Sequence, residues 1–151
     1  MKWTRGSDTV ERLINEGRLE SITGVAASGD MHLRSARALL ASAQREAASN
    51  PEAAYLLAYD AARKAATGLL AHQGLRPRQT GHHVTVEEAV RAQFSGDFHR
   101  MGALRRRRAE IEYPLAPGDE TTKDEAVAAV EDVTKIIDAA EQLLPTLSFF
   151  R

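Results

Sequence analysis

Four consecutive arginines, Arg105–Arg108, stand inside a segment whose apolar spacing predicts a helix. At roughly 100° per residue, Met101, Leu104 and Ile111 fall on one narrow apolar stripe of that helix. Pro114 ends the segment because proline cannot continue the helical hydrogen-bond ladder. A chain that contains such a segment must fold so that the stripe is buried and the arginines are either exposed to water or paired with an anion.

The helical spacing separates the arginines by role. Arg106 points away from the apolar stripe, and Arg105 mostly does, so both are predicted to be solvated charges. Arg108 falls within the stripe, and Arg107 and Glu112 lie on its two flanks. An unpaired guanidinium is costly in such a place, so these positions require a carboxylate or a phosphate-bearing partner.

The composition favours a single all-α domain over residues 1–151. The length suits one packed core, and 43% of the residues are hydrophobic, with alanine frequent and aromatics at only 5%. Such small apolar side chains suit closely packed helices better than strands. Runs of β-branched residues and hairpin dipeptides are missing, so we expect no sheet.

Apolar periodicity predicts an up-and-down bundle of four long helices plus a short N-terminal helix. The short helix covers 8–16, the bundle 30–144 and a tail 145–151. The four long helices are predicted over residues 30–48, 51–73, 97–112 and 121–144, and a shorter helix over 85–94 lies between the second and third of them. The helix over 51–73 is the most apolar, which predicts a central position.

Several helix ends carry local signals. Asn50 is a predicted N-cap, and Thr85 with Glu88 three residues later forms a predicted capping box. After the last helix, Phe149 and Phe150 in the tail form either a flap over a groove or part of a self-association surface.

Two of these segments resemble the HEPN superfamily, and most closely a small stand-alone actinobacterial-type branch of it. They are the central-helix segment Pro51–Ala65, PEAAYLLAYDAARKA, and the later segment Arg105–Pro114, RRRRAEIEYP. The resemblance extends from about Val10 to Leu144. It implies a bundle of four to five helices that commonly pairs into a two-fold dimer. Active members are metal-independent ribonucleases, many of them toxins or effectors, whereas others only bind nucleotides, RNA or a partner protein.

The family's catalytic motif is matched only in part. That motif is an arginine, usually followed by asparagine, with a histidine four to six residues after the arginine. Here Arg107 takes the arginine position, Arg108 stands where asparagine is common, and Glu112 falls where histidine is expected. Another register pairs Arg107 or Arg108 with Tyr113. A glutamate has an ordinary pKa of about 4.3 and repels phosphate, so the resemblance implies a degenerate motif.

The arginine segment supports two ligand-facing hypotheses. In the first, the chain is a non-catalytic or weakly active module whose Arg105, Arg107 and Arg108 engage phosphate of RNA or a nucleotide across a homodimer cleft. In the second, it is an endoribonuclease toxin or effector in which Arg107 stabilises the phosphate and Glu112 or Tyr113 replaces the histidine. The second hypothesis also implies an antitoxin or regulatory protein as partner.

A third hypothesis assigns these arginines a structural role. They would form an ion-pair network that joins helices, with Glu112 and with an acid on the central helix such as Asp60. The chain would then be a structural or regulatory interaction protein.

A second basic segment precedes the helix predicted to begin near residue 85. Arg76 and Arg78 lie in a predicted loop, followed by the adjacent histidines His82 and His83. Two histidines without a further ligand nearby are a weak metal signal, so an exposed pair or the rim of an anion site is the better interpretation. His32 is predicted to lie at the surface.

Other features exclude several classes of protein. There is no cysteine, hence no disulfide framework and no thiolate zinc site. The net charge of −1 argues against a general coat for nucleic acid. We expect a cytoplasmic protein without a signal peptide, a membrane span, a metal or a cofactor.

Overall fold

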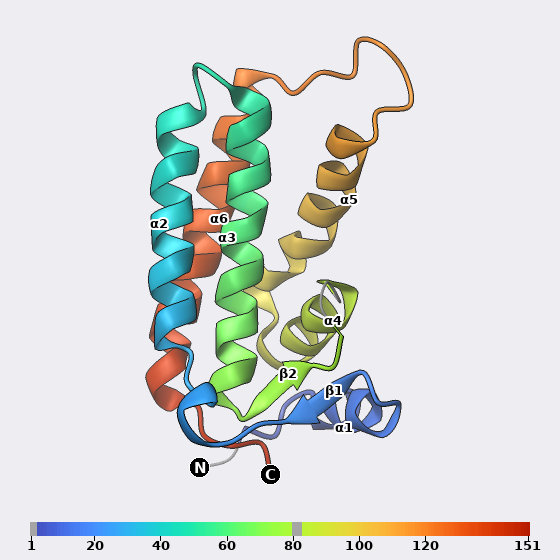
Figure 1. The fold of residues 1–151 in the computed structure, drawn as a ribbon, viewed down its shortest axis with the longest axis vertical. Helices are drawn as coiled ribbons and strands as arrows, with labels where there is room; N and C mark the ends of the chain where they lie inside the picture. Colours follow the sequence, from blue (N-terminus) through green and yellow to red (C-terminus); the bar gives the residue numbers. More distant parts are fainter. Residues whose placement is uncertain (1–2, 80–82) are drawn as a thin grey trace.

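Three long helices pack side by side in the computed structural model, which describes residues 3–79 and 83–151. They are α2 (Asp30–Glu46), α3 (Pro51–His72) and α6 (Lys123–Leu143), and Figure 1 shows them nearly parallel. Each lies within two residues of its predicted bounds. Helix α3 contacts both others and is buried along most of its length, because small apolar residues cover more than one of its faces.

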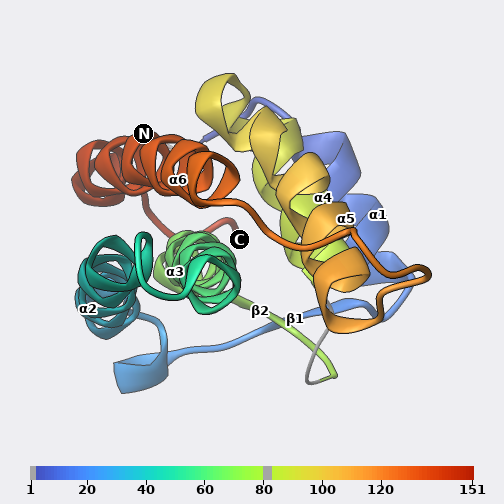
Figure 2. The same cartoon turned by 90° about the horizontal axis from the view of Figure 1, so that it is seen from above.

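A second group of helices packs on the α3 side of these three. It comprises α1 (Ser7–Asn15), α4 (His83–Phe94) and α5 (Met101–Glu112), and Figure 2 shows the three lying together. The mostly helical class is therefore as predicted. The predicted helix over 97–112 is shorter, because Gly96–Arg100 forms the 3₁₀ helix η2. The break follows positive φ angles of 48° at Ser95 and 57° at Gly96.

The described residues also contain a short antiparallel ladder of two strands, so the prediction of no sheet is wrong. Strand β1 (Leu19–Ser21) pairs with β2 (Leu75–Pro77), with Leu19 opposite Pro77. Each strand has three residues, too few to show an alternating pattern, and no hairpin turn joins them. Leu19 and Leu75 are buried, so the ladder closes one end of the core.

The predicted N-cap of α3 is present. Asn50 Oδ1 accepts a hydrogen bond from Ala53 N at 3.2 Å, and Pro51 occupies the first turn. At the start of α6, Thr122 Oγ1 accepts from Glu125 N at 3.1 Å. The Asn50 signal was sufficient because the cap involves residues only three apart.

The predicted capping box at Thr85 and Glu88 is wrong. Helix α4 begins at His83, so both residues lie inside it. Thr85 is buried, and its Oγ1 accepts from Arg18 Nε at 3.1 Å, while Glu88 pairs with Arg12 on α1. Thr85 and Glu88, which the sequence motif assigned to a cap, therefore bind α1 and the connector after it to α4.

The C-terminal tail packs on its own chain. After α6, Leu144–Thr146 forms the 3₁₀ helix η3, and Leu147 is buried. Phe150 N donates to Gln73 O at 2.9 Å, and Arg151 pairs with Glu11. Among the described helices, none is long and apolar enough to cross a bilayer.

Candidate functional site

Arg107 is surrounded by carboxylates from α5, α6 and the loop between them. Its Nη2 donates to Glu125 Oε2 at 3.2 Å, and its Nη1 donates to Asp119 at 3.0 Å and to Glu110 at 3.2 Å. The hydrogen bond to Glu125 is the main cause that raises the pKa of Arg107 above its usual range. With 17% of its side chain exposed, this guanidinium is already paired on several sides.

Arg108 links α5 to the central helix. Its Nη1 donates to Glu112 Oε2 at 2.8 Å, and its Nη2 lies 3.4 Å from Asp60 Oδ1. The guanidinium carbon is 5.6 Å from the centre of the Tyr59 ring. This is the pairing with Glu112 and Asp60 that the structural hypothesis describes.

Arg105 is not the solvated charge that its helical position predicts. Its Nε donates at 2.8 Å to Glu87 Oε2, and Glu87 is only 5% exposed. Arg91 approaches the same carboxylate at 3.3 Å. The neighbouring helix α4 supplies this buried acid, which the pattern of α5 alone could not reveal. Arg106 is exposed, as predicted, and forms no ion pair with a described residue.

The residues of the degenerate motif pair with different partners and not with one another. Glu112 is bound by Arg108, not by Arg107, and Tyr113 is 75% exposed at the end of α5. Within the described chain, Arg107 makes no hydrogen bond or ion pair with Glu112 or Tyr113. Their proposed catalytic and ligand-binding roles stay predictions, and the geometry favours the structural one.

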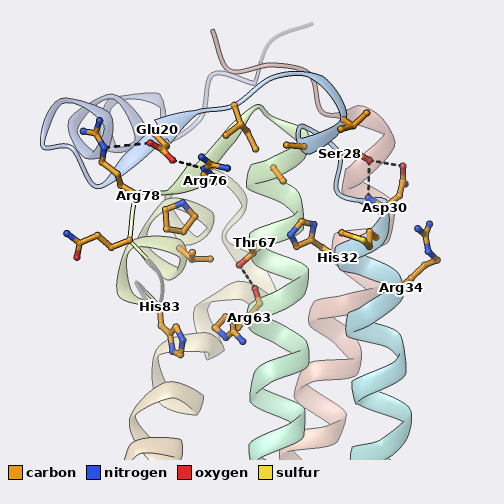
Figure 3. Close-up of a pocket in the computed structure, with 18 residues that line it drawn as sticks. Glu20, Ser28, Asp30, His32, Arg34, Arg63, Thr67, Arg76, Arg78 and His83 are labelled. Atoms are coloured by element: carbon orange, nitrogen blue, oxygen red, sulfur yellow. Dashed lines mark hydrogen bonds and ion pairs between the residues drawn. The ribbon is translucent and has the colours of Figure 1, made fainter.

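A separate cavity of about 880 Å³ lies at the other end of the bundle. It is bounded by the β1–β2 ladder, the 3₁₀ turn η1 (Gly24–Ala26), the start of α2 and the middle of α3. We call it the basic groove, because four arginines line it against two carboxylates (Figure 3). These charged residues are Arg34, Arg63, Arg76 and Arg78, with Glu20 and Asp30.

The arginines of the basic groove differ in how they are paired. Glu20 serves both strand-end arginines, with Oε1 2.6 Å from Arg76 Nε and Oε2 3.6 Å from Arg78 Nε. Arg34, at the outer edge, and Arg63, on the wall formed by α3, form no ion pair with any described residue (Figure 3). The Nε atom of Arg63 is buried and lacks an acceptor among those residues. The basic groove therefore has uncompensated positive charge.

Two histidines line the same groove. Burial and the neighbouring Arg63 and Arg108 lower the pKa of His83, whose ring lies 5.7 Å from that of Tyr59. Burial, with a smaller effect of Lys64 on α3, lowers the pKa of His32, while a backbone hydrogen bond with Ser28 opposes this shift. Both rings therefore favour the neutral form.

The predicted association of His83 with Arg76 and Arg78 is seen, since all three line the basic groove. His82 lies outside the described residues. The surface prediction for His32 holds only in part: the residue is half-buried, and its Nδ1 is buried without a hydrogen-bond partner among the described residues. The side chain packs there because Gly68 opposite has no Cβ, which would lie 2.7 Å from His32 Cβ.

The sequence analysis missed Arg34 and Arg63. They come from two different helices, so no local motif contains both. The sequence did hold a signal for Arg63, because it is a charged residue in the most apolar helix. Burying a charge there without a partner is costly, so such a residue is a candidate for binding a ligand.

The described residues hold no group of three or more His, Asp or Glu side chains placed to bind a metal ion. Comparisons of the chain with protein-family models, with curated proteins and with solved structures found no match.

Proposed function

We propose that this chain is a non-catalytic module that binds a phosphate-bearing ligand, a nucleotide or RNA, in the basic groove. The observation that carries the proposal is Arg63, a guanidinium on the groove wall with a buried Nε and no acceptor among the described residues. A phosphate oxygen supplies the acceptor and the negative charge that this position lacks. Arg76, on the strand ladder, lies at the other end of the groove and is already paired with Glu20, so Arg63 is the phosphate-binding residue of this proposal (Figure 3).

In this proposal the arginine cluster of α5, Arg105–Arg108, is mainly a scaffold. Three of its four members are held by carboxylates of α3, α4, α5, α6 or the loop before α6. A phosphate would have to displace these acids, and they repel it. The support for a scaffold role is thus the pairing itself, with Glu87 as the most buried acid.

The test compares how tightly the wild type, Arg63→Gln and Arg106→Gln bind pyrophosphate. Arg106 is the matched control, because it is an exposed arginine on α5, away from the groove. We expect pyrophosphate to bind the wild type and the control in calorimetry, and Arg63→Gln to weaken binding at least tenfold. Loss of binding in the control and not in Arg63→Gln would contradict the proposal.

A labelled single-stranded RNA, incubated in EDTA, separates binding from catalysis. We expect the RNA to stay intact, and the affinity of the wild type for the RNA to fall as the salt concentration rises. Cleavage by the wild type that Arg107→Gln abolishes would instead establish the ribonuclease hypothesis, with Glu112 or Tyr113 in the place of histidine.

We further propose the wider setting that the resemblance implies. It is an HEPN-like bundle, a homodimer and a cytoplasmic location, with an antitoxin or regulatory protein as a possible partner class. The central place of α3 and the arginine-rich middle of α5 support the bundle proposal. Sedimentation of the purified chain tests the dimer directly.

A further inference from the structure

The edge of the basic groove carries an apolar lip as well as charge. Val25 is fully exposed and Met31 is 67% exposed, and both line the groove. Isolated exposed apolar residues are common on proteins, but these two lie on the rim of one cavity. Ile22 and Ala26 line it beside them. We call these four residues the apolar lip.

The lip and Arg63 lie at different ends of the groove (Figure 3). The lip belongs to η1, to the residues before it and to the start of α2, whereas Arg63 belongs to the middle of α3. Arg76, on β2, lies at the lip end, where it is paired with Glu20. In Figure 3 the segment between Glu20 and Ser28 passes over the groove, and Arg63 lies at its opposite end. A ligand that fills the groove therefore meets an apolar surface at one end and the unpaired guanidinium of Arg63 at the other.

The size of the groove limits the ligand. Its volume of about 880 Å³ lies within the range of roughly 300–1,000 Å³ that is typical of small-molecule sites. A single nucleotide has the required mixture, a flat weakly polar base and an anionic phosphate. A continuous RNA strand would leave most of its length outside the cavity.

Between the two ends, His32 offers a polar contact. Its Nδ1 is buried without a hydrogen-bond partner in the described chain. It lies on α2 and faces the groove opposite Thr67 of α3 (Figure 3). A buried unpartnered nitrogen is costly, and a ribose hydroxyl or a base edge would satisfy it.

We propose that the basic groove takes a nucleoside mono- or diphosphate, with the base on the apolar lip and the phosphates at Arg63. This inference rests on the proposed function and names its ligand class. The lip supplies the preference for a base, and Arg63 supplies the affinity for phosphate.

Calorimetry with ADP, GDP, pyrophosphate and a single-stranded RNA tests the inference. Pyrophosphate carries more charge on its phosphates than ADP, so electrostatics alone favours pyrophosphate. We nevertheless expect ADP or GDP to bind at least tenfold more tightly, because the lip buries the base. The double variant Val25→Ser/Met31→Ser should lose most of this difference while its affinity for pyrophosphate is unchanged. Both residues are exposed, so the variant should fold, as its circular dichroism and melting temperature will show.

The other outcomes are decisive. Pyrophosphate that binds as tightly as both nucleotides would overturn the nucleotide inference and leave phosphate binding at the groove intact. RNA that binds more tightly than either nucleotide, and depends on Arg63, would overturn it in favour of a strand. If no phosphate compound binds, the proposed function itself fails.

Discussion

At the scale of single residues, the position of an arginine around α5 decides what the side chain does. Arg107 faces Glu125 and Asp119, whereas Arg106, its neighbour in the chain, faces solvent. The two have the same charge and the same helix, so they form a matched pair for measuring what pairing contributes to stability.

We predict that Arg107→Gln lowers the free energy of unfolding by about 1–2 kcal/mol, since three carboxylates then lose a shared cation. Arg106→Gln should leave it unchanged within error. Urea unfolding of both variants beside the wild type measures the difference, which should shrink in high salt. Equal effects of the two substitutions would show that the carboxylate pairing of Arg107 contributes little.

The pKa of His83 leads to a prediction for pH dependence. Burial, then Arg63 and Arg108, lowers the pKa of the folded state below about 6.5, whereas Asp60 raises it and Arg105 lowers it further. The unfolded chain therefore binds the proton more readily. The contribution of neutral His83 to the free energy of unfolding should be fully present above about pH 6.5 and should decline as the pH falls below that value.

The measurement is the melting temperature at pH 7.5 and pH 5.5. His83→Gln should lose less stability on acidification than the wild type does, and the exposed control His99→Gln should lose as much as the wild type. The window lies above that of Glu16 and Glu141, whose lowered pKa values make their contribution fall only below about pH 4.5. The same acid loss in all three proteins would refute the assignment to His83.

At the scale of elements, the close approach of α2 and α3 depends on a glycine pair. A Cβ on Gly68 would lie 2.7 Å from His32 Cβ, and one on Gly29 would lie 2.4 Å from Gly68 O. Both contacts involve backbone or a Cβ, which cannot move away as the end of a flexible side chain can. The spacing of these two helices also sets one wall of the basic groove.

We predict that Gly68→Ala destabilises the protein by about 1–2 kcal/mol. Overpacking costs about 1–3 kcal/mol, and the better helix propensity of alanine offsets up to about 1 kcal/mol. Thermal unfolding tests this, with Ala38→Ser on the exposed side of α2 as control. An alanine variant as stable as the wild type would mean that the helices separate without cost.

The extent of sequence-based prediction also follows from the range of the contacts. The long helices and the Asn50 cap were predicted correctly, because periodicity and caps depend on residues a few positions apart. Thr85 was misassigned because its partner, Arg18, comes from 67 positions earlier in the chain. The same reason explains the missed strand ladder and the missed Arg63, whose surroundings arise from four separate segments.

At the scale of the whole molecule, two buried amides connect the chain ends. The side-chain amides of Gln73 and Gln93 exchange hydrogen bonds of 2.7 and 3.0 Å. The backbone oxygen of Gln73 accepts from Phe150 N at 2.9 Å, and that of Gln93 accepts from Trp3 Nε1 at 3.0 Å. Because both glutamines are almost fully buried, the pair joins the C-terminal tail, α3, α4 and the N-terminal segment.

The amide pair leads to a prediction of strong coupling. Gln73→Leu alone leaves the amide of Gln93 buried without a partner, which costs about 1–3 kcal/mol, and Gln93→Leu does the same to Gln73. The double variant leaves no orphaned amide, so its loss should be well below the sum of the single losses. Trp3, the only tryptophan, reports on the same end of the molecule by its fluorescence. If the chain ends unfold together with the core, fluorescence and circular dichroism will give one unfolding transition in every variant. Separate transitions, or losses of stability that add up in the double variant, would show that the chain ends are independent of the bundle.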